Sequence, residues 1–132
     1  MRDKHLAAVC EEYLERARRH LPVEVMEVED DAALLRRIPN GAGVEVVALE
    51  AGGEAWDTAR LTASIEHGMV HGQRQLVFLI GGSDGLPPAA VARAARRLSL
   101  SPLTLPHRLA RVVLAEQIYR ALSIIKGEPY NR

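Results

Sequence analysis

Cysteine, aromatic residues and long apolar runs are all scarce in this chain of 132 residues. The single cysteine, Cys10, excludes a disulfide within the chain. With one Phe, one Trp and three Tyr, the core must be built from aliphatic side chains. The longest apolar runs, such as residues 76–80, are far too short to span a bilayer, so we expect no membrane contact. Since we also find no signal-like segment, we expect a cytoplasmic protein.

Charge is balanced over the whole chain, with 17 basic and 17 acidic residues, but not along it. Residues 1–84 carry nine Lys and Arg against fifteen Asp and Glu, whereas residues 85–132 carry eight against two. This basic C-terminal third indicates either a contact with an anion such as a phosphate, or pairing with an acidic face of the same protein.

Strand-like and helical patterns alternate along the sequence, which predicts a single α/β domain over residues 1–132 with a parallel sheet. The predicted helices span residues 3–20, 30–37, 57–71, 87–97 and 106–125. The predicted strands span residues 23–28, 44–49 and 75–80, and a short strand and loop begin at Leu98. A glycine turn over residues 51–53 is expected after the second strand.

A glycine loop, residues 81–85, follows the apolar strand 75–80. Open α/β sheets bind ligands where their strands end, so this loop is a candidate site. It lacks the Lys-Ser/Thr pair of a phosphate loop. Its glycines therefore indicate either a plain tight turn or a close approach of the backbone to a ligand.

Three other groups of reactive side chains have plainer explanations. His67 and His71 are four residues apart on a helix, as two metal ligands would be, but no third ligand accompanies them, so we expect solvent-facing histidines and no metal site. Cys10 is expected to be a small packing residue. Asp57 is expected to cap a helix and not to act as an acid.

Residues 98–111, LSLSPLTLPHRLAR, join an apolar segment broken by prolines to a basic helix. Arg108 and Arg111 are three residues apart and share a helix face. Taken alone, the helix is explained by an amphipathic pattern with solvated charges. The order of parts, from glycine loop to Leu/Ser/Thr loop, basic helix and aromatic-basic tail, instead favours a loop that holds a ligand beside arginines that meet an anion.

Four stretches that show this order resemble the RlmH family: VVALEAGGEAWDT, VFLIGGSDGL, LSLSPLTLPHRLARVVLAEQIYRA and GEPYNR. They cover about two thirds of the chain, and DKHLAAVCEEYLERARRHLP is more weakly similar to the family's first helix. RlmH proteins are SPOUT-class methyltransferases that act on N3 of a pseudouridine (1915) in 23S ribosomal RNA. The resemblance implies a SPOUT-type α/β knot, in which helices flank a mostly parallel sheet and about residues 76–132 form a trefoil knot.

The resemblance also implies S-adenosyl-L-methionine as cofactor, a homodimer whose subunits together complete the site, and 23S rRNA within the assembled ribosome as partner. Carried over by motif, the cofactor-binding residues are Leu49, Gly81, Leu100, Ser101, Pro102, Leu103, Thr104 and Leu105. The catalytic residues would be Tyr130, Asn131 and Arg132. The RNA-binding residues would be Arg108, Arg111 and Arg132.

The sequence departs from the family pattern in two places. RlmH proteins usually begin with a strand before the first helix, which is missing here, and their tail usually ends Tyr-His-Arg where this one has Tyr130, Asn131 and Arg132. A carboxamide cannot accept a proton near neutral pH as an imidazole can, so we expect cofactor binding with weakened or absent turnover. The alternatives are a catalytically impaired or truncated knotted dimer that binds cofactor only, and a small-molecule-binding α/β module whose basic helix pairs with an acidic partner.

Overall fold

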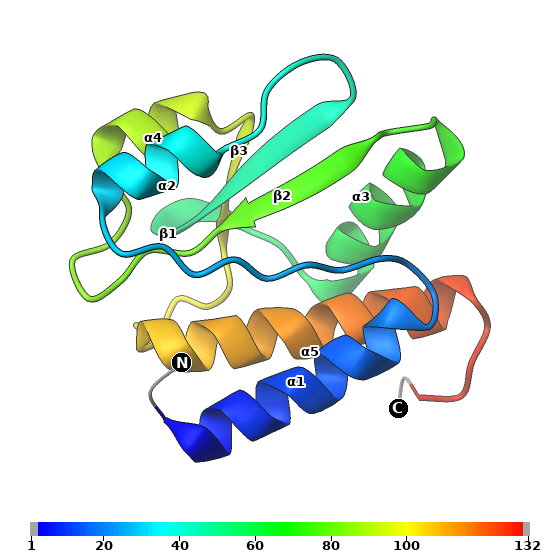
Figure 1. The fold of residues 1–132 in the computed structure, drawn as a ribbon. Helices are drawn as coiled ribbons and strands as arrows, with labels where there is room; N and C mark the ends of the chain where they lie inside the picture. The colour runs from blue at the N-terminus through cyan, green and yellow to red at the C-terminus, as the bar shows by residue number, and fades with distance from the viewer. Residues whose placement is uncertain (1–2, 131–132) are drawn as a thin grey trace.

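A parallel sheet of three strands forms the centre of the protein (Figure 1), in a computed structural model that describes residues 3–130. The central strand β1 (Val44–Ala55) lies between β2 (Gln75–Leu79) and β3 (Arg96–Ser99), and both pairings are parallel. The α/β class and the parallel sheet are therefore confirmed. The threading of residues 76–132 as a trefoil knot stays a prediction.

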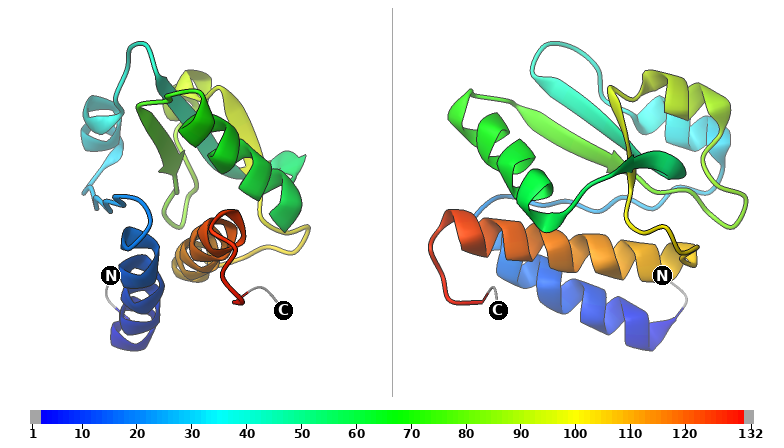
Figure 2. Two further views of the ribbon diagram at one scale, coloured as in Figure 1. Left: turned by 90° about the vertical axis from the view of Figure 1, so that its right-hand side faces the viewer. Right: turned by 180° about the vertical axis from the view of Figure 1, so that it is seen from behind.

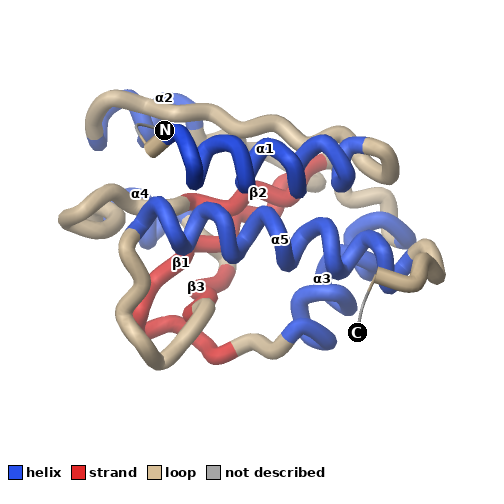
Figure 3. The backbone as a smooth tube through the Cα atoms, turned by 90° about the horizontal axis from the view of Figure 1, so that it is seen from below, coloured by secondary structure: helices blue, strands red, loops and turns tan. Residues whose placement is uncertain are grey.

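Helices cover both faces of this sheet (Figure 2). They are α1 (Lys4–Arg18), α2 (Asp31–Arg37), α3 (Thr58–Val70), α4 (Pro88–Arg93) and α5 (His107–Ile125). Helices α2 and α4 pack on one face, and α3 and α5 pack on the other. Helices α1 and α5 lie side by side, as the view from below in Figure 3 shows.

Strand β2 has apolar side chains on both of its faces, because successive residues of a strand point in opposite directions. Leu76 and Phe78 pack in the cluster that contains Leu61 and Leu122 of α3 and α5. Val77 packs in the other cluster, beside Ala90 of α4. The continuous apolar run predicted a strand buried on both faces; the strand and its apolar contacts on both faces are confirmed, although Leu76, Val77 and Phe78 are only partly buried.

The predicted strand over residues 23–28 is wrong. This segment is extended but forms no β-pairing with the described strands. Side chains hold it instead: Arg18 Nε donates to the carbonyl oxygen of Val23 at 2.9 Å, and Arg111 Nη1 donates to Glu27 Oε1 at 2.6 Å. The alternation of Val and Glu reflects packing of Val23 against helices rather than membership of the sheet.

Helix α4 is shorter than predicted. It ends at Arg93, and the sequence that the helical pattern extended to residue 97 turns into β3. The backbone N–H of Ala95 donates to the carbonyl oxygen of Val46 at 2.8 Å, which brings the chain onto the edge of β1. Pairing with the central strand therefore overrides the helical propensity of an alanine- and arginine-rich segment.

Strand β1 continues through the predicted glycine turn. Its pairing with β3 is irregular between Leu49 and Glu54, and both of these residues are paired with Leu98. Gly53 allows β1 to pair with β3 again after the irregular stretch. A Cβ at this position would lie 2.7 Å from the carbonyl carbon of Arg97. The predicted turn is thus an irregular stretch within one long strand. It ends at Gly53, whose backbone must lie close to the backbone of β3.

Candidate functional site

The cofactor-binding residues predicted from the resemblance lie at one edge of the sheet. Gly81 follows the carboxyl end of β2, and the leucine loop, residues 100–105, follows the carboxyl end of β3. Leu49 lies beside Leu98, near the start of that loop. Figures 1 and 2 show both loops at the same end of the molecule, next to the first turn of α5. This is the edge at which parallel sheets place their ligands.

The glycine loop is a tight turn that packs against itself. The backbone N–H of Gly85 donates to the carbonyl oxygen of Gly82 at 3.0 Å, and Gly85 has a φ of 78°. A Cβ on Gly81 would lie 2.6 Å from the backbone nitrogen of Leu86. The turn therefore tolerates no side chain at Gly81, while the neighbouring Gly82 faces open space.

The leucine loop stays outside the sheet. Ser99 Oγ donates to the carbonyl oxygen of Ser101 at 3.0 Å, and Ser101 Oγ accepts from the backbone N–H of Leu103 at 2.9 Å. Leu103 is 75% exposed, which is unusual for so apolar a side chain. The loop thus presents apolar surface and backbone groups that are not used in strand pairing.

A cavity of about 280 Å³ begins where β3 ends. It is lined by Trp56, Asp57, Thr58, Leu61, Leu98, Leu100, Val113 and Gln117. The indole Nε1 of Trp56 is buried without a hydrogen-bond partner in the described part of the chain. On another wall, Thr58 Oγ1 donates to Gln117 Oε1 at 2.7 Å. No motif marks Gln117, and the only sequence signal for Trp56 is that it is the lone tryptophan, within VVALEAGGEAWDT.

Tyr130, a predicted catalytic residue, packs on α5 and not at the two loops. Its Oη donates to Glu116 Oε2 at 2.6 Å. Because a helix rises about 1.5 Å per residue, Glu116 lies about 14 Å along α5 from His107, which follows the leucine loop. Within one chain Tyr130 therefore packs on the middle of α5 and not beside the first turn of the helix, where the leucine loop ends. Asn131 and Arg132, the other predicted catalytic residues, lie outside the described residues.

Burial and hydrogen bonding shift the pKa values of Tyr130 and Glu116 in opposite directions. Burial, together with the hydrogen bond to Glu116, raises the pKa of Tyr130 well above its usual range. Partial burial alone would raise the pKa of Glu116, but hydrogen bonds from Arg120 and Tyr130 lower it. At neutral pH Tyr130 is consequently a hydrogen-bond donor and not a base.

Much of the basic C-terminal third pairs with acidic residues of the N-terminal part. The ion pairs are Arg96–Glu45 at 3.4 Å, Arg97–Glu50 at 3.3 Å and Arg111–Glu27 at 2.6 Å. Of the two explanations for the uneven charge, internal pairing accounts for these three arginines. Arg111, predicted to bind RNA, is only 25% exposed in its side chain and already holds a carboxylate.

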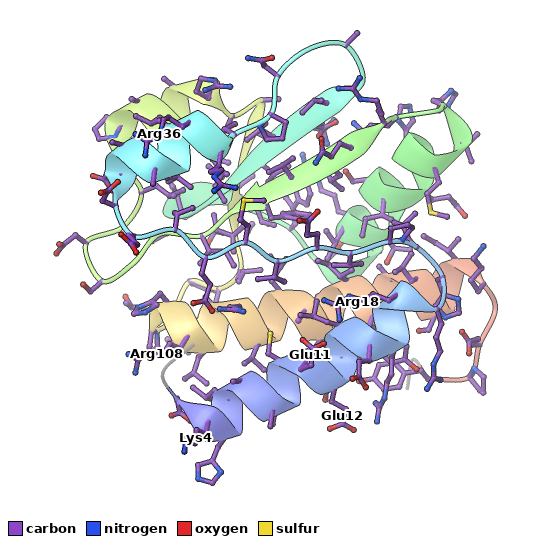
Figure 4. All side chains as sticks on the ribbon, viewed as in Figure 1. Lys4, Glu11, Glu12, Arg18, Arg36 and Arg108 are labelled. Carbon is purple, nitrogen blue, oxygen red and sulfur yellow. The ribbon has the colours of Figure 1, made fainter. Side chains whose placement is uncertain are left out.

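Arg108 differs from these arginines. It forms no ion pair within 4 Å with a carboxylate of residues 3–130, although it interacts electrostatically with Asp3. Figure 4 shows Arg108 in the first turn of α5, at the same end of the helix pair as Lys4. Of the predicted RNA contacts, it is the described arginine with a charge available for an external anion.

We expect the Glu27–Arg111 ion pair to make the folded state sensitive to acid. The hydrogen bond from Arg111 lowers the pKa of Glu27 from 4.5 to about 2. A carboxyl group with a depressed pKa contributes stability above its unfolded pKa, and this contribution is lost as the pH falls through the folded value. Between about pH 5 and pH 2, the free energy of unfolding should therefore fall further in the native chain than in Glu27→Gln. Denaturant titrations at each pH would measure this, and equal losses would contradict it; added salt should shrink the difference.

The residues given plainer explanations behave as expected. Asp57 caps α3, because its Oδ1 accepts from the backbone N–H of Arg60 at 2.8 Å. Cys10 is 2% exposed and packs in the core. His67 and His71 are exposed, and their rings lie 4.2 Å apart. Among the described residues, no group of three or more potential ligands could hold a metal, and no helix has the length and apolarity to cross a membrane.

Comparison with known proteins shows the family of this chain. Residues 1–131 match the family described as "Predicted SPOUT methyltransferase". A protein of Sorangium cellulosum named "Ribosomal RNA large subunit methyltransferase H" is 46% identical, over 98% of this chain and 92% of its own. The protein of the same name in Solibacter usitatus is 43% identical over 99% and 92%, and that of Alkalilimnicola ehrlichii is 54% identical over 74% and 63%. The chain therefore belongs to the RlmH family of SPOUT methyltransferases.

Proposed function

We propose that this methyltransferase transfers a methyl group from S-adenosyl-L-methionine to N3 of a pseudouridine in 23S ribosomal RNA, within the assembled ribosome. The observation that carries the proposal is the position of the glycine loop and the leucine loop, which follow β2 and β3 at the same end of the parallel sheet. The names of its relatives, which are ribosomal RNA methyltransferases, support the class of substrate. Since ribosomes are its proposed substrate, the cytoplasm is its proposed place of action.

The residues at this edge fit the proposed cofactor. The close packing of residues 85–86 on Gly81 fixes the shape of the glycine loop, and the open space beside Gly82 leaves its backbone groups accessible to a ligand. The leucine loop adds apolar side chains and backbone groups outside the sheet, which suit an adenine ring and its polar edge. When bound, S-adenosyl-L-methionine supplies an electrophilic methyl group. Leu49, Leu100 and Leu105 would exclude water from it.

The proposed reaction requires the uracil N3 to lose its proton. Tyr130 stays protonated, so it can donate a hydrogen bond or stack on a base but cannot take that proton. Asn131 can orient the edge of a base, and its carboxamide is not a base. Methyl transfer should consequently depend on positioning alone and be slow. The carboxamide of Asn131 is the observation that supports a second candidate function, a cofactor-binding dimer with little or no turnover.

We infer that the working unit is a homodimer. In one chain Tyr130 packs on the middle of α5, away from the first turn of the helix where the leucine loop ends, and a second copy would bring another tail to that end. Leu103 and Leu109 support this, because they are 75% and 41% exposed near the start of α5. Exposed apolar side chains near one end of a helix suit a surface that binds another protein.

Calorimetry with S-adenosyl-L-methionine, followed by methyl incorporation into ribosomes that lack the modification, tests the proposal. We expect binding together with slow incorporation. Binding without incorporation would support the cofactor-binding dimer, and absence of binding would reject both in favour of the small-molecule module.

Arg108→Gln should weaken ribosome binding and reduce its salt dependence, because one phosphate contact is lost. Arg37→Gln, a change at an exposed arginine of α2, serves as the matched control.

A further inference from the structure

Glu116 is the centre of a partly buried hydrogen-bond cluster on α5. Its carboxylate accepts from Tyr130 Oη at 2.6 Å, from Arg120 Nη2 at 2.7 Å and from Gln117 Nε2 at 3.0 Å. The side chain is only 17% exposed. Three donors at such distances, on a charged and half-buried acceptor, are stronger than ordinary surface contacts.

Aromatic contacts hold the ring of Tyr130 in the same place. The guanidinium of Arg120 lies 4.9 Å from the centre of this ring, and the ring of Tyr119 lies 4.6 Å from it. Tyr119 is in turn 6.4 Å from Tyr13 of α1. The seat of Tyr130 therefore rests on both helices of the α1–α5 pair and not on a single mobile side chain.

The chain between α5 and Tyr130 is folded back to reach this seat. Gly127, with a φ of 73°, ends the helix, and the backbone N–H of Glu128 donates to the carbonyl oxygen of Ser123 at 2.8 Å. Glu128 also forms an ion pair with His20, just beyond α1. Figure 1 shows the segment turning back beneath α5. A capped turn followed by a seated aromatic ring is a built arrangement, since a solvated tail would need neither.

From this geometry we propose that Glu116, Tyr119 and Arg120 form a tail latch that seats Tyr130, so that Glu116 is a positioning residue for the tail. Its catalytic consequence rests on the proposed function, in which residues 131–132 act on the RNA base. Those two residues follow Tyr130 directly, so the seat fixes the point from which they start. Gln117 extends the latch to the cavity at the end of β3, because it also accepts from Thr58.

The test compares Glu116→Ala with Glu116→Gln, which keeps an acceptor oxygen, and with Tyr130→Phe, which keeps the ring and removes only the hydroxyl. Glu11→Gln is the matched control, since it removes an exposed carboxylate paired with Arg18 on α1. Thermal unfolding verifies that each variant folds. Hydrogen exchange of the peptide from Lys126 to the end of the chain reports the seat, and calorimetry with S-adenosyl-L-methionine and methylation kinetics report its consequence.

We expect Glu116→Ala to speed exchange of the tail peptide about tenfold, with a smaller effect in Glu116→Gln and Tyr130→Phe. The kcat should fall about tenfold while cofactor affinity is unchanged. Exchange in Glu116→Ala equal to that in Glu11→Gln would overturn the latch. Faster exchange with an unchanged kcat would overturn the positioning role. If the native chain binds no cofactor and methylates nothing, the proposed function fails, and the exchange rates alone still decide whether the latch exists.

Discussion

Replacing Asn131 with histidine should raise the rate of methyl transfer about 100-fold, the lower end of what a positioned general base contributes. The proposed target nitrogen carries a proton that must leave, and an imidazole next to Tyr130 could accept it at neutral pH, whereas the carboxamide cannot. Affinity for S-adenosyl-L-methionine should change little, because residue 131 is proposed to act on the RNA base and is not among the residues proposed to hold the cofactor. Single-turnover incorporation of labelled methyl groups into unmodified ribosomes measures the effect.

Two controls distinguish proton transfer from mere improvement of packing. Asn131→Ala should react at about the native rate if the amide plays no chemical part. In Asn131→His the rate should rise with pH through about 6.5, as the imidazole loses its proton, and the native chain should lack this step. Equal rates for Asn131→His and the native chain would refute the idea that the missing base limits turnover.

Gly81→Ala should lower the affinity for S-adenosyl-L-methionine by at least about 100-fold. The loss of one well-placed polar contact alone lowers an affinity about tenfold, and here several backbone groups of the loop would be displaced. The added Cβ would lie 2.6 Å from the backbone nitrogen of Leu86, which is closer than real Cβ atoms approach other atoms. The atoms that this Cβ would meet belong to the backbone of Gly85 and Leu86 and not to a flexible side chain, so the glycine loop would have to open. The backbone groups that we propose to hold the cofactor would then be displaced.

Gly82→Ala is the matched control for this prediction, because nothing lies within 4 Å of its Cβ position. Calorimetry on both variants, with circular dichroism to verify the fold, gives the comparison. Gly82→Ala should bind within a few-fold of the native chain. If Gly81→Ala bound as tightly as Gly82→Ala, the glycine loop would be a plain turn with no part in cofactor binding.

The helices were predictable because their signals are local. Asp3, Asp30 and Asp57 each accept from backbone N–H groups at the start of a helix, and such caps are readable from the sequence. The end of α4 was not readable, because it depends on Val46, about fifty residues earlier in the chain. The prediction of a strand over residues 23–28 was wrong for the same reason. An alternating pattern favours a strand, but a strand forms only where another strand is available to pair with it.

The two loops of the candidate site were predictable from short motifs that follow strands. The place of Tyr130 was not, because it depends on a fold-back at Gly127 and on Glu116, which no motif marked. Charge counts also could not distinguish arginines that form internal ion pairs from arginines that are available to an external anion. Only the structure separates Arg111, which holds Glu27, from Arg108, which holds no carboxylate in the described residues.

The order of the strands in the sheet has a consequence for folding of the chain during its synthesis on the ribosome. The middle strand, β1, is made first, and both of its neighbours are made later, β3 last of all. While the nascent chain emerges, β1 must therefore wait with one unpaired edge until residues 96–99 have left the exit tunnel. The sheet can close only late in synthesis, and such delayed, non-local pairing is inherently slow.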